Sequence, residues 1–280
     1  MSDLEGRTIL ITGANTGIGR ATALALGKRG ATLYLACRSE AKAAPVIEEI
    51  KAAGNDDVHF LALDLGDLAS VRACAASFLA KEDRPLHVLL NNAGLAGHQG
   101  TTKDGFELTF GVNHLGHYLL TELLLERLEA SAPSRIVNVA SKAHYQASSI
   151  DWDALRKPTK TTTGLDEYQV SKLCNVLYAK ELARRLEGTG VTTYSLHPGV
   201  IASDVWRKVP WPIRPLMTAF MKSNTDGAKT SIHCATSDAV SGESGLYYDE
   251  CKVKDPLPLA LDTALADELS KRSAAWVAQP

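Results

Sequence analysis

Short runs of apolar and β-branched residues alternate along the chain with longer segments in which apolar residues recur every three or four positions. The short runs are TILIT, ATLYLAC, VHFLALDL, HVLLNNAG, RIVNVAS, VTTYSLHPG and GLYYD. The segments with helical spacing lie near residues 18–29, 40–53, 68–80, 105–129, 166–187, 224–236 and 260–276. This alternation predicts βαβ units, in which helices cover both faces of a parallel, doubly wound sheet.

The pattern gives no reason to divide the chain. No linker, repeat or low-complexity run separates its 280 residues, so we expect a single α/β domain over residues 1–280. Two stretches break the alternation, a polar insertion at 143–167 and a segment rich in Trp, Pro and Met at 203–223. Long irregular segments in compact domains are commonly binding loops, and we expect the second stretch to be a substrate lid.

Composition narrows the class of protein. The chain is 45% hydrophobic and 22% charged with a net charge of −2, which gives no broad electrostatic footprint for nucleic acid. The five cysteines are scattered and never form a C-x-x-C pair, which argues against a disulfide framework or zinc site. The acidic start and the lack of a long apolar run indicate neither a signal peptide nor a transmembrane anchor. We therefore expect a cytoplasmic protein.

A glycine-rich turn, TGANTGIG at 12–19, follows the first strand and precedes a helix. Gly13, Gly17 and Gly19 would allow a tight turn and a close approach of the backbone to a pyrophosphate. The spacing is G-x-x-x-G-x-G and not the commoner G-x-G-x-x-G, so a purely structural turn is the alternative. The strand before it and the helix after it favour a dinucleotide site.

The ends of the next two strands bear on the choice of cofactor. The second strand ends in Cys37-Arg38, where an acidic residue would bind both ribose hydroxyls of NAD. A guanidinium forms forked bonds to phosphate, so Arg38 favours NADP(H), although a solvated charge at the strand end is the alternative. Asp64, after the third strand, would accept a hydrogen bond from the adenine amino group, or would cap a helix.

The motif YQVSK at 168–172 places a tyrosine and a lysine four positions apart in a predicted helix. Residues i and i+4 lie on one helix face, so Tyr168 and Lys172 can form a proton-transfer pair. For an isolated motif, a half-exposed tyrosine beside a solvated lysine is the alternative.

Taken in order, these motifs resemble the short-chain dehydrogenase/reductase family, and in particular its retinol dehydrogenase-like branch, along essentially the whole chain. The resemblance rests on TGANTGIG at 12–19, Asp64, NNAG at 91–94, GVNHLGHYLLT at 111–121, VNVAS at 137–141, YQVSK at 168–172 and HPG at 197–199. It implies a Rossmann-type fold and an oxidoreductase that uses a nicotinamide cofactor, which Arg38 predicts to be NADP(H).

The resemblance implies a catalytic set of Asn113, Ser141, Tyr168 and Lys172. Tyr168 would be the general acid or base, and Lys172 would lower the pKa of its phenol and bind the nicotinamide ribose. Ser141 would donate to the substrate oxygen, and Asn113 would hold a water that relays protons to Lys172.

The resemblance also implies the residues that bind cofactor and substrate. The implied cofactor residues are Gly13, Asn15, Thr16, Gly17, Ile18, Gly19, Arg38, Asp64, Leu65, Asn91, Ala93, Gly94, Tyr168, Lys172, Pro198, Gly199 and Val200. The implied substrate residues are Ser141, His144, Tyr145, Tyr168 and Trp206. Two alternatives remain: Asn91 only stabilises a turn, and Pro198 and Gly199 only end a strand.

Two features depart from the usual pattern of the family. Ser141 precedes Tyr168 by 27 residues, a long spacing that resembles the retinol dehydrogenase-like branch. It would bring His144, Tyr145 and Trp152 near the substrate, with packing of the insertion as the alternative. The segment 203–223 is interpreted first as a lid, then as ordinary packing or a subunit contact, and last as a membrane-touching surface.

The sequence thus predicts an NADP(H)-dependent enzyme that interconverts apolar aldehydes or ketones and alcohols, with no metal and with reduction as its working direction. The alternative is an NADP-binding scaffold or redox sensor without turnover. The pair His114 and His117 is better explained by core packing than by metal binding. In the family, the helices near 105–129 and 166–187 commonly form subunit interfaces, which implies a homodimer or homotetramer, with a monomer as the alternative.

Overall fold

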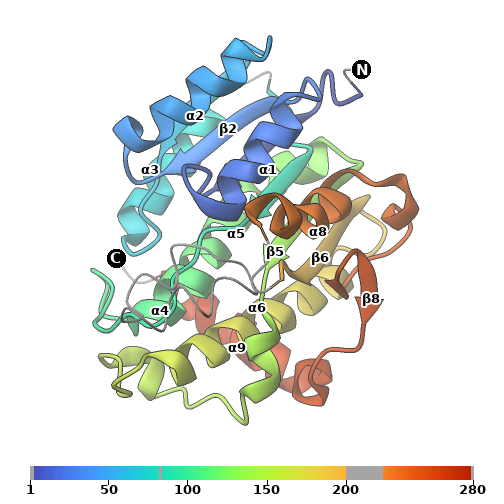
Figure 1. Ribbon diagram of the computed structural model, residues 1–280. Helices are drawn as coiled ribbons and strands as arrows, with labels where there is room; N and C mark the ends of the chain where they lie inside the picture. Colours follow the sequence, from blue (N-terminus) through green and yellow to red (C-terminus); the bar gives the residue numbers. More distant parts are fainter. Residues whose placement is uncertain (1–2, 82–83, 200–222, 279–280) are drawn as a thin grey trace.

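The computed structural model describes residues 3–81, 84–199 and 223–278, which form one eight-stranded sheet between layers of helices (Figure 1). The strands are β1 (Thr8–Thr12), β2 (Thr32–Cys37), β3 (Val58–Ala62), β4 (Val88–Asn91), β5 (Ser134–Val139), β6 (Val191–His197), β7 (Leu246–Asp249) and β8 (Lys252–Lys254). The main helices are α1 (Gly17–Gly27), α2 (Glu40–Ala52), α3 (Leu68–Leu79), α4 (Leu108–Phe110), α5 (Gly116–Ala130), α6 (Leu165–Arg185), α8 (Asn224–Thr236) and α9 (Thr263–Val277).

The strand order is β3-β2-β1-β4-β5-β6-β7-β8, and every neighbouring pair is parallel except β7 and β8. This arrangement confirms the predicted doubly wound parallel sheet. The seven predicted strands and the seven predicted helical segments are all present, while the short antiparallel strand β8 was not predicted. Its sequence, Lys-Val-Lys, is exposed at all three positions, so it carries no pattern of burial.

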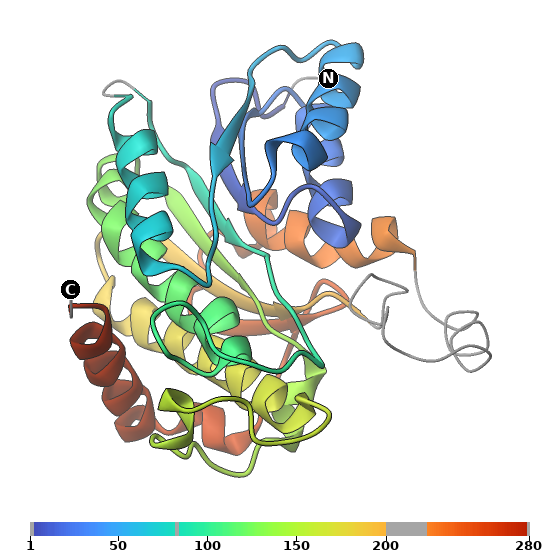
Figure 2. The same ribbon diagram turned by 90° about the vertical axis from the view of Figure 1, so that its left-hand side faces the viewer.

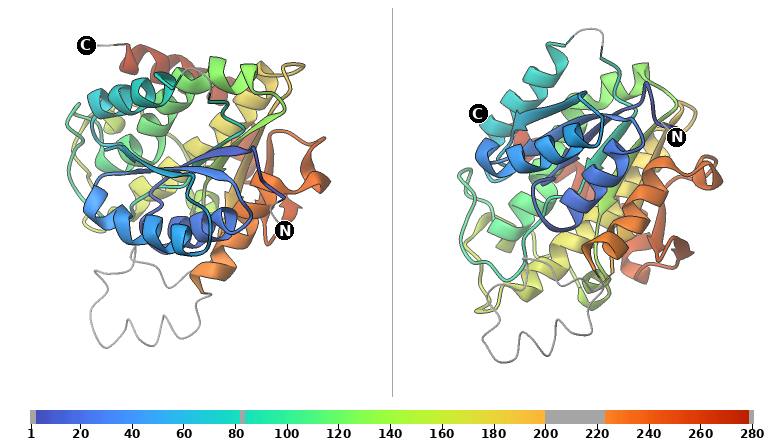
Figure 3. Two further views of the ribbon diagram at one scale, coloured as in Figure 1. Left: turned by 90° about the horizontal axis from the view of Figure 1, so that it is seen from above. Right: turned by 45° about the horizontal axis from the view of Figure 1, so that its top comes forward.

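The apolar runs are buried because each strand serves two cores. In β1, Ile9 and Ile11 pack into one core, together with residues of α1, α2 and α8. Leu10, which points to the other face, packs with residues of α3, α5 and α6. The views in Figure 3 show these helical layers on opposite faces of the sheet. Helix α9 lies outside α6 and packs against it (Figure 2).

The chain changes direction in the sheet between β1 and β4. Strand β1 pairs with β2 on one side and with β4 on the other, so the connections after these strands leave in opposite directions. In open parallel sheets, ligands bind in the crevice at the carboxyl ends of the strands beside such a switch point. The turn after β1, the NNAG loop after β4 and Ser141 after β5 all lie at this edge.

The insertion at 143–167 packs against the rest of the protein. The backbone carbonyl of Leu155 accepts from the Glu107 N–H at 2.9 Å, and the Thr159 hydroxyl donates to the Glu107 carboxylate at 2.5 Å. The Trp152 ring lies 4.9 Å from the Arg272 guanidinium of α9. Trp152 therefore packs on α9, which favours the packing alternative for this residue.

Some of the predicted cofactor and substrate residues lie outside the described residues. This holds for Val200, for Trp206 and for all of the predicted lid at 203–223 except Ser223. Within the described ranges, no helix has the length and hydropathy that a membrane span requires.

Candidate active site

The glycine turn after β1 is held in a conformation that side chains would disturb. Gly13 has φ +67° and Gly17 has φ +56°, both in the left-handed region that favours glycine. A Cβ at Gly19 would lie 2.3 Å from the Gly13 carbonyl oxygen, and one at Gly13 would lie 2.9 Å from the Cα of Ala93. The turn therefore needs glycine for its shape and for its contact with the loop after β4.

The turn ends at the amino terminus of α1, an eleven-residue helix whose first turn contains no acidic residue. Its free N–H groups and the positive end of its dipole are therefore not neutralised locally, which suits an anion such as a pyrophosphate. Asn15 and Thr16 precede the helix, and the Thr16 side chain is exposed and makes no capping bond. Ile18, in the first turn, is partly buried.

Thr12, which the sequence analysis did not single out, joins the turn to the NNAG loop. Its buried hydroxyl oxygen accepts from the N–H groups of Asn92 at 3.0 Å and Ala93 at 2.9 Å. The Asn92 amide donates back to the Thr12 carbonyl at 2.8 Å. The Asn91 amide instead donates to polar side chains of α5 and β5 inside the core. The turn-stabilising role considered for Asn91 thus belongs to its neighbour Asn92.

The two residues that bear on the adenosine end of the cofactor are both exposed. Arg38 follows β2 and has no ion-pair partner in the part of the chain that the structure describes. Asp64 accepts from the Gly66 N–H at 2.9 Å. The cap of α3 is Asp67, which accepts from the N–H groups at the start of that helix. The capping alternative for Asp64 was therefore wrong, and Leu65 beside it is buried in the core.

Tyr168 and Lys172 lie one turn apart in α6, with the Lys172 Nζ 5.7 Å from the centre of the Tyr168 ring. Lys172 is 4% exposed, and its Nζ donates to the Val139 carbonyl at 2.8 Å. Burial lowers the pKa of Lys172 to about 8, because desolvation disfavours its charged form. The alternative of a solvated lysine is thereby excluded.

The side chain of Ser141, two residues beyond the end of β5, interacts with the Tyr168 phenol and lowers its pKa. Burial raises the pKa of the Tyr168 phenol above its ordinary value of 10, and the interaction with Ser141 offsets part of that rise. The lowering of this pKa by Lys172 stays a prediction. The phenol keeps its proton at neutral pH, as a general acid must before it donates.

Asn113 lies in a π-helical turn, η1 (Gly111–Leu115), between α4 and α5. Such turns are rare and often mark functional sites. The Asn113 amide exchanges two hydrogen bonds of 2.9 Å with the backbone of Leu95, just beyond the NNAG loop. A Cβ at Gly94 would lie 3.3 Å from the Asn113 Oδ1 and 3.5 Å from the Lys172 Nζ. Gly94, Asn113 and Lys172 therefore converge at one point.

The predicted substrate residues of the insertion are held by protein contacts. His144 is buried, with its Nδ1 2.6 Å from the Ser141 carbonyl oxygen and its Nε2 accepting from the Leu257 N–H at 3.1 Å. Both ring nitrogens are thus engaged, which favours the packing alternative for His144. Tyr145 is 36% exposed and its hydroxyl donates to the Asp255 carbonyl at 2.5 Å.

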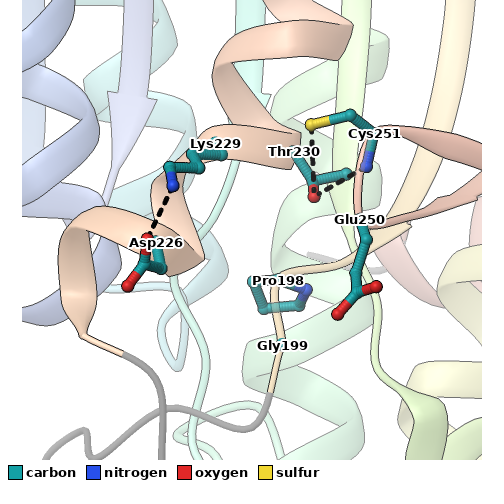
Figure 4. A pocket seen from close by; sticks show the side chains of 7 residues that line it. All are labelled: Pro198, Gly199, Asp226, Lys229, Thr230, Glu250 and Cys251. Atoms are coloured by element: carbon teal, nitrogen blue, oxygen red, sulfur yellow. Dashed lines mark hydrogen bonds and ion pairs between the residues drawn. The ribbon is translucent and has the colours of Figure 1, made fainter.

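Pro198 and Gly199, after β6, line a cavity of about 370 Å³ (Figure 4). The other lining residues are Asp226, Lys229 and Thr230 of α8, and Glu250 and Cys251 between β7 and β8. Thr230 accepts from the Cys251 N–H at 3.3 Å, which ties the two sides together. Pro198 and Gly199, the predicted nicotinamide residues, therefore border this cavity, and their role toward the cofactor stays a prediction.

The glycine turn lies at the same edge of the sheet as four side chains, those of Asn113, Ser141, Tyr168 and Lys172. The strand order of the sheet is the doubly wound one. Residues 7–152 match the family described as short chain dehydrogenase. The chain belongs to the short-chain dehydrogenase family. Membership indicates an oxidoreductase that uses a nicotinamide dinucleotide.

The similar proteins include curated members of the retinol dehydrogenase-like branch. The chain is 46% identical to "Retinol dehydrogenase 12" of Homo sapiens over 270 residues, which cover 95% of this chain and 84% of that protein. It is 48% identical to "Retinol dehydrogenase 11" of Homo sapiens over 255 residues, 89% of this chain and 79% of that one. A crystal structure of an uncharacterized protein from Mycobacterium paratuberculosis has a TM-score of 0.76 and 30% identity, covering 98% and 96% of the two chains.

Proposed function

We propose that this protein is an NADP(H)-dependent oxidoreductase that interconverts apolar aldehydes or ketones and alcohols, with Tyr168 as its acid or base. The observation that carries the proposal is the placement of Tyr168, whose phenol pKa burial raises and Ser141 partly lowers, one helical turn from the buried Lys172. A protein that only binds the cofactor has no need of this arrangement.

In the direction of reduction, the cofactor would supply hydride to the carbonyl carbon. Tyr168 would give its phenolic proton to the carbonyl oxygen, and Ser141, whose side chain interacts with Tyr168, would orient that oxygen. Lys172, whose pKa of about 8 leaves it mostly charged at pH 7, would stabilise the phenolate that remains. In oxidation of an alcohol, the phenolate would take the proton back.

The preference for NADP(H) rests on Arg38. This exposed guanidinium follows β2, the strand whose end meets the adenosine ribose in dinucleotide-binding folds. It has no carboxylate partner among the described residues, so a 2′-phosphate would meet a cation that is not already neutralised. The glycine turn and the uncompensated amino terminus of α1 would hold the pyrophosphate.

The apolar class of substrate rests on relatives whose names give retinol as their substrate, at 46% and 48% identity over most of this chain. Retinol is an alcohol with a long hydrocarbon body, so a pocket that accepts it must be largely apolar. We extend the proposal to apolar aldehydes and ketones as a class and not to retinal alone.

The test is oxidation of NADPH, and separately of NADH, by the purified protein over long aliphatic aldehydes, retinal, aromatic ketones and steroids. Tyr168→Phe should lower kcat by about 10²- to 10⁴-fold, because the general acid is lost. Tyr194→Phe is the matched control, since that hydroxyl donates to the Val240 backbone carbonyl and Tyr194 is not among the implied site residues, and it should retain activity. Tight NADPH binding without turnover of any carbonyl would favour the scaffold alternative.

A further inference from the structure

His117, in the first turn of α5, is 3% exposed and hydrogen-bonded at both ring nitrogens. Its Nδ1 lies 3.0 Å from the backbone carbonyl oxygen of Asn113, one turn earlier in the π-helical segment. Its Nε2 lies 2.8 Å from the hydroxyl oxygen of Thr12, the last residue of β1. The His117 side chain thus connects the π-helical turn that contains Asn113 with β1, the strand that leads into the glycine turn.

The proton positions follow from the partners. A carbonyl oxygen can only accept, so the His117 Nδ1 carries the proton and donates to Asn113. Burial lowers the pKa of His117 to about 4, with a smaller contribution from the charge of Lys172, so the ring is neutral at physiological pH. The Nε2 of a neutral ring with a protonated Nδ1 is an acceptor, and the Thr12 hydroxyl therefore donates to it.

The chain of hydrogen bonds continues beyond Thr12. With its proton directed to His117, the Thr12 hydroxyl oxygen accepts from the N–H groups of Asn92 and Ala93 in the NNAG loop. That loop is also bonded to Asn113, through the pair of hydrogen bonds between the Asn113 amide and Leu95. The π-helical turn and the cofactor loop are thus joined twice, once through Leu95 and once through His117 and Thr12.

We propose that His117 is a positioning residue that fixes the catalytic Asn113 turn relative to the cofactor loop. It acts on the reaction through Asn113 and on the cofactor through Thr12, without touching either reacting molecule. The proposal rests on the proposed function for its kinetic consequences, but its structural consequences can be measured without turnover.

An apolar side chain of similar size would fill the same volume but would leave the Thr12 hydroxyl with only its 3.5 Å contact to the Leu90 carbonyl. A buried hydroxyl without a good acceptor destabilises the folded state, so the hydroxyl would turn to recover a partner. Turning would disturb its bonds to the loop amides. Packing alone therefore does not account for a histidine here.

The two hydrogen bonds of the His117 ring can be removed one at a time by substitution with asparagine or glutamine, whose side-chain amides lie at different distances from the backbone. In His117→Asn, the side-chain amide lies near the position of Nδ1 and can still donate to Asn113, but it cannot reach Thr12. In His117→Gln, the terminal amide lies near the position of Nε2 and can still accept from Thr12, while the bond to Asn113 is lost. His117→Leu keeps the approximate volume and loses both bonds.

The experiment measures NADPH affinity by calorimetry, kcat at saturating NADPH, and amide hydrogen exchange of peptides covering 88–96 and 111–118. We expect His117→Gln to bind NADPH like the wild type, to lose kcat about 10- to 100-fold, and to exchange faster only at 111–118. His117→Asn should keep kcat within about threefold at saturation, bind NADPH about 10-fold more weakly, and exchange faster at 88–96. His117→Leu should show both defects.

Two results would overturn the proposal. One is a Leu variant with wild-type affinity, kcat and exchange, and the other is a pair of Asn and Gln variants that lose affinity and kcat in the same proportion as their loss of Tm. The wild type and Tyr168→Phe are measured beside them. If the wild type binds NADPH but turns over no carbonyl, the proposed function fails while the exchange pattern and the affinities still decide the role of His117.

Discussion

The glycine turn after β1 and the catalytic face of α6 lie at the same edge of the sheet, yet they are held by different kinds of interaction. The turn is limited by backbone: Gly13 and Gly17 have positive φ, and a Cβ at Gly19 would strike a carbonyl oxygen. The catalytic face is built by buried polar side chains, among them Lys172 and Asn113, that hydrogen-bond to distant segments.

The difference teaches what each region can tolerate. Steric limits at a turn admit no larger residue, so a substitution there should act on cofactor binding first. Buried polar groups are instead costly to desolvate, so a substitution on the catalytic face can lower activity and raise stability together. The predictions below test this contrast.

The largest effect is expected at Gly19. In Gly19→Ala, the new Cβ would lie 2.3 Å from the Gly13 carbonyl oxygen and 2.5 Å from the Asn92 amide, so the turn must shift. We expect NADPH affinity to fall more than about 100-fold and the free energy of unfolding to fall by about 1–3 kcal/mol. Calorimetry and thermal unfolding measure the two effects.

Gly242→Ala is the matched control, because a Cβ at Gly242 would meet no atom within 4 Å. It should leave both the affinity and Tm unchanged. An alanine at position 19 with wild-type NADPH affinity would show that the close approach of turn and loop is not required.

The second prediction concerns Lys172, whose replacement should raise the free energy of unfolding, whereas Gly19→Ala should lower it. Its pKa is about 8 in the folded protein and 10.5 in a solvated lysine, so the unfolded chain holds the proton more tightly. The cost to the folded state, about 3 kcal/mol, is fully present below pH 8 and disappears as the pH rises toward 10.5. Removing the charge should therefore stabilise the protein at pH 7.

We expect Lys172→Met to gain about 2 kcal/mol at pH 7, since the lost bond to the Val139 carbonyl offsets part of the benefit. The gain should shrink when the same unfolding curves are measured at pH 10. Turnover should be lost at both pH values. A variant less stable than the wild type at pH 7 would mean that a favourable interaction of the charge outweighs its desolvation.

The same contrast explains what could be predicted from the sequence. The strands and helices were readable because β1 and its neighbours are apolar on both faces, and the glycine turn was readable from its spacing. The role of Thr12 was not, because its partners lie about 80 residues away in the NNAG loop. The same holds for His117, whose ring meets a residue more than 100 positions distant.

Local spacing gave a wrong alternative for the helix cap and no information on burial. Asp64 and Asp67 both precede α3, and only the backbone shows that Asp67 is its cap. Burial, which raises the pKa of Tyr168, also depends on how the surrounding segments pack, whereas spacing showed only that Lys172 shares its helix face. Sequence pattern thus predicted that Tyr168 and Lys172 share a helix face, as the structure shows, but not how deeply the two side chains are buried.

A third, smaller effect is expected at the adenosine end of the turn. Arg38→Leu removes an exposed guanidinium that has no described ion-pair partner, so the loss should fall on the cofactor and not on the fold. We expect NADPH affinity to fall about 10- to 100-fold, as for the loss of one charge-assisted phosphate contact, with little change for NADH. Arg7→Leu, an exposed arginine before β1 at the opposite edge of the sheet, is the control. Equal losses for NADPH and NADH would remove Arg38 from the choice between the two cofactors.

The smallest effect separates the two aspartates near α3. Asp67 accepts from the N–H groups of Ala69 and Ser70, so Asp67→Ala should lower the free energy of unfolding by about 1 kcal/mol. Asp67→Asn keeps a capping oxygen and loses only the exposed ion pair with Lys103, and it should be nearly as stable as the wild type.

Asp64→Ala should leave Tm almost unchanged and weaken NADPH binding a few-fold, because Asp64 is exposed at the predicted adenine site and its carboxylate bonds only locally, to the Gly66 N–H. If Asp64→Ala lowers Tm and leaves the affinity intact, Asp64 serves the loop alone, and the backbone-limited turn together with Arg38 must suffice to hold the adenosine end.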